Sequence, residues 1–186
     1  MNTRQIQRQK TKQKITDAFF SLYEEMPIEK ISIKEITSLA GCHRSTFYEY
    51  FTDIYDLLKQ EEDSILRLQL QNIITPAKER RIDLLQTSSF ITPFLNLYEQ
   101  KGRYLMILLG EHGDPAFARK IKSNIVSAAK EVFDFAGDDI KSEYLLEFIA
   151  SGAFASINLM YKNKNIDLNT LIKYLHPIIS KVMLPE

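Results

Sequence analysis

The polar side chains around Phe47 and Phe51 are the groups of this sequence best suited to chemistry, and that chemistry is binding. The two phenylalanines lie four residues apart, so on a helix they point inward together. The outer faces then carry the polar side chains of Arg44, Ser45, Thr46, Glu49 and Tyr50. Polar groups bind base edges in the major groove, and hydroxyl groups also bind phosphates. The segment is therefore typical of a helix that reads DNA.

Patterns for catalysis or metal binding are missing from the sequence. His43, His112 and His176 are far apart, and none has a second His or Cys at the spacing of metal ligands. Glu111 and His112 are adjacent in a glycine-flanked loop, where a metal or acid–base role is conceivable, but an exposed loop is the better interpretation. No glycine-rich phosphate loop or nucleophile elbow occurs. We therefore expect no enzymatic activity, no metal and no cofactor.

Cys42 is the single cysteine, so no disulfide can form within the chain. Its place beside the reading segment allows two interpretations, a thiol sensor or a small buried apolar residue. The second is favoured, because free cysteines are most often buried and inert.

Two short helices are expected to flank a turn, and the second of them is the reading segment. Ser32 and Glu35 form a capping-box pattern that begins a helix at about 33–40. Gly41 fits the end of that helix, because glycine accepts the left-handed backbone conformation found there. A second helix follows at about 44–50. This is the helix-turn-helix arrangement, in which the first helix braces the second in the major groove.

The rest of the chain is also expected to be helical, because apolar residues recur at helical spacing and no alternating strand pattern occurs. The fold class is therefore all-α. The expected long helices span about 5–25, 54–73, 115–135, 141–162 and 167–182, with Thr52 or Asp53 capping the second. Thr75-Pro76 is expected to break the chain, and Thr92-Pro93 to begin a helix. Short helices are expected between Gly102, Gly110 and Gly113.

A longer motif connects these features. It consists of Ser32-Ile33-Lys34-Glu35-Ile36, Ala40-Gly41, Arg44-Ser45-Thr46-Phe47-Tyr48, Phe51 and Leu57-Leu58. This motif resembles the DNA-binding domain of TetR/AcrR-type transcriptional regulators. The close resemblance covers about residues 10–58; beyond them only the helix layout and length are similar. It implies a DNA-binding domain at 1–55 and a helical effector-binding and dimerisation domain at 56–186.

Together the residues and the resemblance give a set of expected DNA contacts. The expected DNA-binding residues are Ser32, Lys34, His43, Arg44, Ser45, Thr46, Tyr48, Glu49 and Tyr50. The resemblance implies that Arg44 contacts bases or phosphate and that Tyr48 hydrogen-bonds a phosphate. His43 stands where the family often has a helix-capping residue, and its imidazole can cap the helix or touch phosphate.

Two positions depart from the family pattern. Ile54 stands where related proteins often carry a lysine that meets phosphate. Glu49 is an acid on the reading face, which can accept a hydrogen bond from a cytosine amino group. Alternatively, Glu49 pairs with a nearby Arg or Lys and never touches DNA, and this alternative is favoured.

The charge of the chain is distributed unevenly. The net charge is zero, yet the first sixteen residues contain Arg4, Arg8, Lys10, Lys12 and Lys14 and no acid. Such a basic arm is compatible with phosphate binding, and a solvated terminus is the alternative. No membrane span or signal peptide is recognisable, so a cytoplasmic location is expected.

The C-terminal part is expected to bind an effector and a second copy of the chain. Aromatic residues at helical spacing are candidates for an effector pocket, although plain core is the commoner explanation: Phe94, Tyr98, Tyr104 and Phe117. The expected homodimer interface includes Leu145, Ile149, Gly152, Ser156, Leu171 and Leu175. The function implied is a repressor that binds a palindromic operator on double-stranded DNA and is released by an effector. The alternative is a helical ligand-binding or interaction protein that kept the fold without specific DNA binding.

Overall fold

The computed structural model of the chain describes residues 3–79, 87–132, 140–163 and 167–183, which form helices and short loops with no strand among them. In chain order the α-helices are α1 (Thr3–Glu25), α2 (Ile33–Ala40), α3 (Arg44–Tyr48), α4 (Ile54–Gln69), α5 (Thr75–Lys78), α6 (Thr87–Leu108), α7 (Pro115–Val132), α8 (Ile140–Asn163) and α9 (Leu168–Met183). The all-α expectation is confirmed. None of the described helices is long and apolar enough to cross a membrane.

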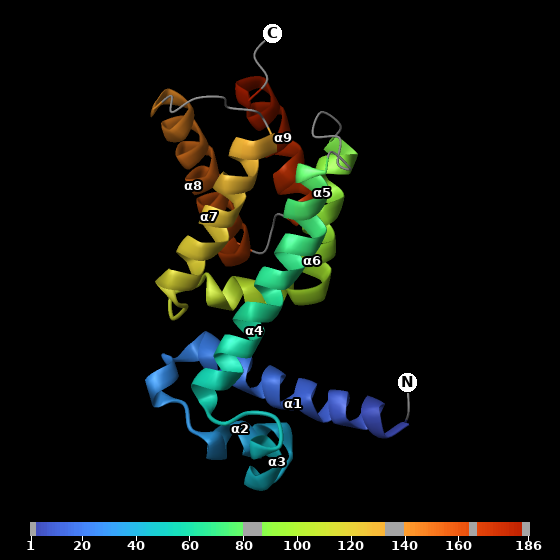
Figure 1. Ribbon diagram of the computed structural model, residues 1–186. Coiled ribbons are helices and arrows are strands. Elements are labelled where there is room, and N and C mark those ends of the chain that lie inside the picture. The colour runs from blue at the N-terminus through green and yellow to red at the C-terminus, as the bar shows by residue number, and fades with distance from the viewer. Residues whose placement is uncertain (1–2, 80–86, 133–139, 164–166, 184–186) are drawn as a thin grey trace.

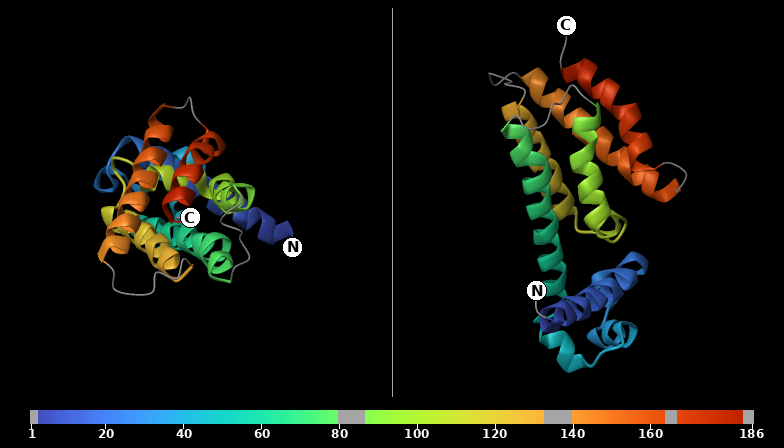
Figure 2. Two further views of the ribbon diagram at one scale, coloured as in Figure 1. Left: turned by 90° about the horizontal axis from the view of Figure 1, so that it is seen from above. Right: turned by 90° about the vertical axis from the view of Figure 1, so that its right-hand side faces the viewer.

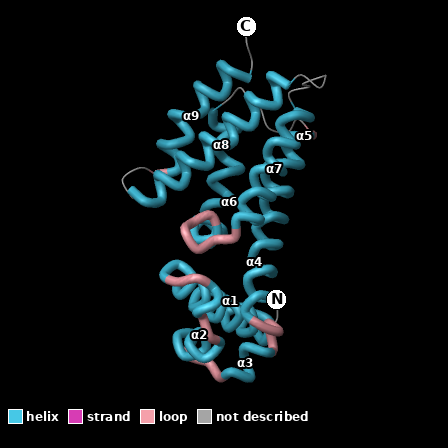
Figure 3. Tube along the Cα trace, turned by 90° about the vertical axis from the view of Figure 1, so that its left-hand side faces the viewer, coloured by secondary structure: helices cyan, strands magenta, loops and turns pink. Residues whose placement is uncertain are grey.

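The helices are arranged in two tiers. Figure 1 shows α1, α2 and α3 at one end of the molecule, with α4 rising from them into the group formed by α5 to α9. Figure 2 shows α1 lying across the base of α4, and Figure 3 shows the turn that joins α2 to α3 at the far end. We call residues 3–58 the helix-turn-helix end. The expected domain boundary near residue 55 falls at the start of α4 and stays a prediction.

One continuous apolar core joins the two tiers. At the helix-turn-helix end it contains Ile15, Phe19, Phe20, Ile36, Phe47, Phe51 and Leu57, and from α6 and α7 it contains Tyr104, Ile107, Leu108, Phe117 and Ile121. The ring of Phe20 on α1 stacks on that of Tyr104 on α6, with centroids 4.2 Å apart. In addition, Lys101 on α6 forms an ion pair of 2.7 Å with Glu61 on α4. Helix α6 is therefore attached to both α1 and α4.

Two expected breaks in the chain are absent. The sequence predicts the end of a helix at Thr75-Pro76, but the backbone continues through a π-helical turn (Leu70–Ile74) into α5. Pro76 lies in the first turn of α5, directly after the π-helical turn, so the helical backbone passes through the proline. The sequence also predicts the start of a helix at Thr92-Pro93, whereas α6 already begins at Thr87 and passes through Pro93. Packing against neighbouring helices can outweigh such a local preference.

Gly102 also lies inside α6 rather than at a break. A Cβ atom at this position would come within 2.7 Å of the ring of Tyr98, so the glycine makes room for that ring. Gly113 lies in the turn between α6 and α7, where a Cβ atom would come within 1.9 Å of the backbone oxygen of Leu108. The first glycine therefore serves packing, and the second serves a turn.

Candidate nucleic-acid interface

The turn between α2 and α3 is built as the sequence predicts. The hydroxyl of Ser32 accepts from the backbone N–H of Glu35 (3.3 Å), and the Glu35 carboxylate accepts from the backbone N–H of Ser32 (2.9 Å). Hydrogen bonds from Ser32 lower the pKa of Glu35. At the other end of α2, Gly41 adopts φ 65° and ψ 38°, the left-handed conformation that ends the helix. The capping box and the glycine turn are both confirmed.

Aromatic side chains fix the orientation of α3. Phe47 is 0% exposed, Phe51 is 2% exposed, and their ring centroids are 5.5 Å apart. Phe47 also meets the ring of Tyr48 edge-on. A helix of this length has little stability of its own, so burial of the two phenylalanines must hold it in place. The remaining side chains of α3 are then directed outward by default.

The outward side chains include most of the expected DNA-binding residues. Those exposed to solvent are Ser32, Lys34, His43, Arg44, Ser45, Tyr48 and Glu49, and those half-buried are Thr46 and Tyr50. His43 occupies the N-cap position of α3, but its side chain makes no capping hydrogen bond. The imidazole is therefore not engaged as a helix cap.

Arg44 and Tyr48 form a pair that sequence reasoning treated as separate contacts. The guanidinium donates to the Tyr48 hydroxyl from Nη2 (3.0 Å) and Nε (3.3 Å), and it lies 5.6 Å from the centroid of the ring. The four-residue spacing that brings them together on one face of α3 was visible in the sequence. An arginine has five N–H donors, so the pairing leaves donors for another partner.

The basic arm is the first half of α1 and not a loose tail. The guanidinium of Arg8 lies 5.9 Å from the centroid of the Tyr50 ring. Lys12 donates to Gln60 on α4 (2.8 Å) and lies 5.2 Å from the centroid of the Phe51 ring. These positive charges of α1 are therefore held against the segment that directly follows α3. Figure 1 shows α1 at the same end of the molecule as α3.

Glu49 and Cys42 can now be placed. Glu49 is exposed, and the ion pairs among the described residues join other side chains, so its carboxylate faces solvent.

Cys42 is half-buried against the core, and burial raises the pKa of its thiol. A thiol with a raised pKa is protonated at neutral pH and weakly nucleophilic. This favours a packing role for Cys42 over a sensing role.

The expected effector-pocket residues are not gathered around one described cavity. Tyr104 and Phe117 belong to the core, and the Tyr104 hydroxyl is hydrogen-bonded to Asp17 and Gln13 of α1. Tyr98 is partly exposed, and the side chain of Phe94 lies outside the described residues. A cavity does lie between α4, α5 and α7, but none of these four residues lines it. The proposed effector role of the four stays untested.

The surface of α8 and α9 differs from the expected one in detail. Gly152 is exposed, whereas Leu145, Ile149, Ser156, Leu171 and Leu175 are half-buried. The large apolar side chains that face solvent include Ile140, Tyr144, Phe148, Tyr174 and Ile178. On α8 these exposed residues recur every four positions and lead to Gly152. The exposed apolar residues of α8 could not be predicted from the sequence, because α8 is apolar on nearly all sides and its pattern does not show which side faces inward.

Solved structures of similar fold include three regulatory proteins. A TetR transcriptional regulator from Streptococcus agalactiae 2603V is 25% identical, with a TM-score of 0.60 over 95% of this chain and 97% of that chain. The fatty acid degradation regulator FadR from Bacillus halodurans is 15% identical, with a TM-score of 0.64 over 94% and 95%. A TetR-family transcriptional regulator from Streptomyces coelicolor is 16% identical, with a TM-score of 0.58 over 92% and 81%. No model of a known family matches the chain, and no curated protein matches it in sequence.

Proposed function

We propose that this chain, which has the fold of the TetR-family transcriptional regulators, is a sequence-specific DNA-binding regulator that acts as a homodimer on a palindromic operator. The similarity of fold extends over nearly the whole chain, and the structural neighbours are regulators of this type. The resemblance seen in residues 10–58 is therefore confirmed at the level of the complete fold. Repression, with release by an effector, is the output that we propose.

The observation that carries the proposal is the exposed polar face of α3. Its apolar side is buried through Phe47, while Arg44, Ser45 and Tyr48 face solvent next to a helix-turn-helix turn with a confirmed capping box and glycine end. Solvent-exposed arginine and hydroxyl groups on such a helix suit base edges and phosphates. The basic half of α1 lies beside the same helices and can add phosphate contacts.

Dimerisation is supported by the apolar side chains of α8 and α9 that face solvent. Phe148 is 78% exposed, and Tyr144 and Tyr174 are similarly uncovered. Large exposed apolar surfaces commonly mark protein interfaces. A four-helix interface formed by α8 and α9 of two copies would cover these side chains. The resulting dimer would contain two copies of α3. These two helices must sit about 34–36 Å apart to enter successive major grooves.

Capture of genomic fragments by the purified chain, followed by sequencing, tests the proposal. We expect enriched fragments that share an inverted repeat with half-site centres about 10–10.5 base pairs apart, or a multiple of that distance. Random enrichment would favour the alternative, a helical ligand-binding or interaction protein without specific DNA binding.

Removal of residues 1–9 provides a second measurement, because it deletes Arg4 and Arg8. If these side chains neutralise phosphates, the slope of log affinity against log salt should become shallower by about 0.9 for each phosphate that they neutralise. An identical slope would mean that the first turns of α1 do not meet the DNA backbone.

A further inference from the structure

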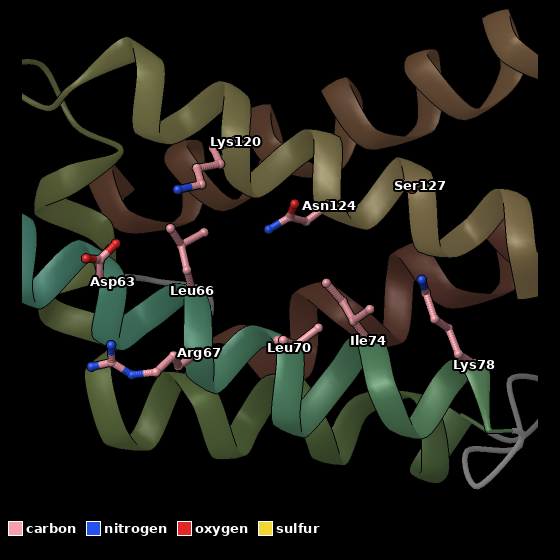
Figure 4. A pocket seen from close by; sticks show the side chains of 9 residues that line it. All are labelled: Asp63, Leu66, Arg67, Leu70, Ile74, Lys78, Lys120, Asn124 and Ser127. Carbon is pink, nitrogen blue, oxygen red and sulfur yellow. The ribbon is translucent and has the colours of Figure 1, made fainter.

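A cavity of about 390 Å³ opens between α4, α5 and α7. Figure 4 shows its two walls. The lower wall consists of Leu66 and Leu70 with Ile74 of the π-helical turn, and α7 contributes Lys120, Asn124 and Ser127 from the opposite side. Drug-sized ligands commonly bind in cavities of about 300–1,000 Å³ that combine apolar walls with a few polar groups. The size and lining of this cavity therefore suit a small organic molecule.

The buried side-chain amide of Gln69 joins α4 to α7 beside the cavity. Gln69, which is 1% exposed, donates to the backbone oxygen of Ile121 on α7 (3.0 Å) and accepts from the side-chain amide of Asn124 (3.3 Å). These hydrogen bonds fix the spacing of α4 and α7 beside the cavity. The side chain of Asn124 lies between the two helices (Figure 4). The cavity is therefore a built feature with positioned polar groups.

The charged groups of the lining favour an anion. Arg67, Lys78 and Lys120 are positive and Asp63 is negative, which leaves a surplus of positive charge. Lys120 extends from α7 into the space above Leu66 (Figure 4), and its ammonium group makes no ion pair within the described residues. Arg67 turns away from α7, so Lys120 is the cation best placed to meet a ligand that lies on the leucines.

We propose that this cavity binds a small organic anion, with an apolar body against Leu66, Leu70 and Ile74 and its acidic group beside Lys120. The proposal deepens the regulatory function proposed above and rests on it only for the effect on DNA binding. An anion without an apolar body would leave the floor of the cavity, formed by Leu66, Leu70 and Ile74, exposed to water. A neutral apolar molecule would make no ion pair with Lys120.

Lys120 also connects the cavity to the helix-turn-helix end. Glu62, one turn of α4 away from Leu66, interacts with Tyr23 of α1, Asp114 of the turn before α7, its neighbour Asp63, and Lys120. Burial, followed by Asp114 and Asp63, raises the pKa of Glu62 to about 7, whereas Lys120 lowers it. The buried Oε1 of Glu62 has no hydrogen-bond partner among the described residues. An anion that pairs with Lys120 would weaken its support of the Glu62 carboxylate, so ligand binding should be accompanied by proton uptake at Glu62.

Fluorescence titration with 8-anilinonaphthalene-1-sulfonate tests the cavity directly. This probe combines an apolar body with a sulfonate, and N-phenyl-1-naphthylamine offers a similar body without the charge. We expect one saturable site per chain for the sulfonate and weaker binding of the neutral analogue. Lys120→Gln should weaken sulfonate binding about three- to fivefold, as expected for one solvent-accessible ion pair. Leu70→Glu, which places an acid on the floor, should weaken it further, whereas Leu70→Gln should weaken it less.

Arg119→Gln is the matched control, because Arg119 is a cation on the same helix that does not line the cavity. It should leave sulfonate binding unchanged. Equal affinity of the Lys120→Gln variant and the wild-type protein, or no saturable binding at all, would overturn the proposal. These outcomes are independent of DNA, so they separate a failure of the cavity from a failure of the regulatory function.

Calorimetry of the same titration at pH 7.5, in two buffers with different ionisation enthalpies, tests the connection to Glu62. We expect uptake of a fraction of a proton per site in the wild-type protein. Glu62→Gln should abolish this uptake without weakening the binding of the sulfonate. Unchanged proton uptake in the Glu62→Gln variant would contradict the proposed link between the cavity and the helix-turn-helix end.

Discussion

The helix-turn-helix end buries its aromatic core side chains, whereas α8 and α9 leave several of theirs in solvent. Phe47 on α3 is 0% exposed, and Phe148 on α8 is 78% exposed. The same residue type therefore completes a core at one end and remains without a cover at the other. A single chain is enough to form the outward face of α3 that we propose reads DNA, whereas the exposed apolar side chains of α8 and α9 could be buried only by a partner.

Phe47→Ala should have the largest effect on the stability of the chain. Truncation of a fully buried phenylalanine costs about 3–5 kcal/mol, because it removes apolar contact and leaves a cavity. We expect the midpoint of denaturant unfolding to fall accordingly. Phe148→Ala is the matched control, and in the isolated chain its stability loss should be small. Similar losses for the two variants would contradict the contrast between buried and exposed aromatic residues.

Phe148→Glu should split the homodimer and leave the fold of each chain intact. A charge cannot be buried cheaply in an apolar interface, yet this side chain already faces solvent in the single chain. Loss of the second copy should lower operator affinity by about 10²–10⁴-fold, the usual gain from joined binding sites. Light scattering gives the mass, and a gel shift gives the affinity.

Gly152→Arg is a second way to split the dimer. A Cβ atom at this position meets nothing within 4 Å in the single chain, so the larger side chain has room there. The variant should fold and be monomeric as well. Leu70→Glu is the control, since Leu70 is exposed but lies on neither α8 nor α9. A wild-type protein that is monomeric at micromolar concentration would contradict the dimer.

Arg44→Ala should weaken specific binding by about 1–3 kcal/mol, the usual contribution of an arginine that reads a base. The stability of the chain should change little, because Arg44 is exposed. Together with Phe47→Ala, this variant separates the outer face of α3, which should matter for DNA, from the inner face, which should matter for folding. Affinity for the operator would be measured by fluorescence anisotropy, with Arg119→Ala, at an exposed arginine of α7, as the control. Unchanged affinity would remove Arg44 from the interface.

Tyr48→Phe should have the smallest effect, about 0.5–1.5 kcal/mol, the net contribution of one hydrogen bond. The loss should be similar for specific and non-specific DNA, because phosphates carry no sequence information. Tyr55→Phe, at an exposed tyrosine of α4, is the matched control. Since Arg44 donates to the Tyr48 hydroxyl, the two changes should not be additive in a double-mutant cycle. A loss confined to one operator sequence would contradict the phosphate contact.

The helix-turn-helix end could be predicted from local signals. The Ser32–Glu35 capping box, the glycine at 41 and the spacing of Phe47 and Phe51 each depend on neighbouring residues, and each was found as expected. Helix α2 has the predicted bounds. By contrast, the pairing of Arg44 with Tyr48 depends on side-chain orientation, which helical spacing allows but does not require.

The C-terminal part was less predictable because tertiary packing decides its details. Thr75-Pro76 was expected to break the chain, yet the helical backbone continues through it from the π-helical turn into α5. Gly102 looked like a break too, yet it accommodates the ring of Tyr98 inside α6. On α8 the apolar residues surround the helix, so no pattern could assign Leu146 inward and Phe148 outward. The cavity between α4 and α7 needs residues from separate helices, which a single stretch of sequence does not reveal.

Paired reading of an operator is tested by comparing a complete operator with one in which a single half-site is scrambled. Two copies of the chain joined through α8 and α9 should engage both half-sites at once. The scrambled duplex should therefore bind at least about a hundredfold more weakly under the same salt conditions. Equal affinity for the two duplexes would contradict paired, sequence-specific reading by two copies of α3.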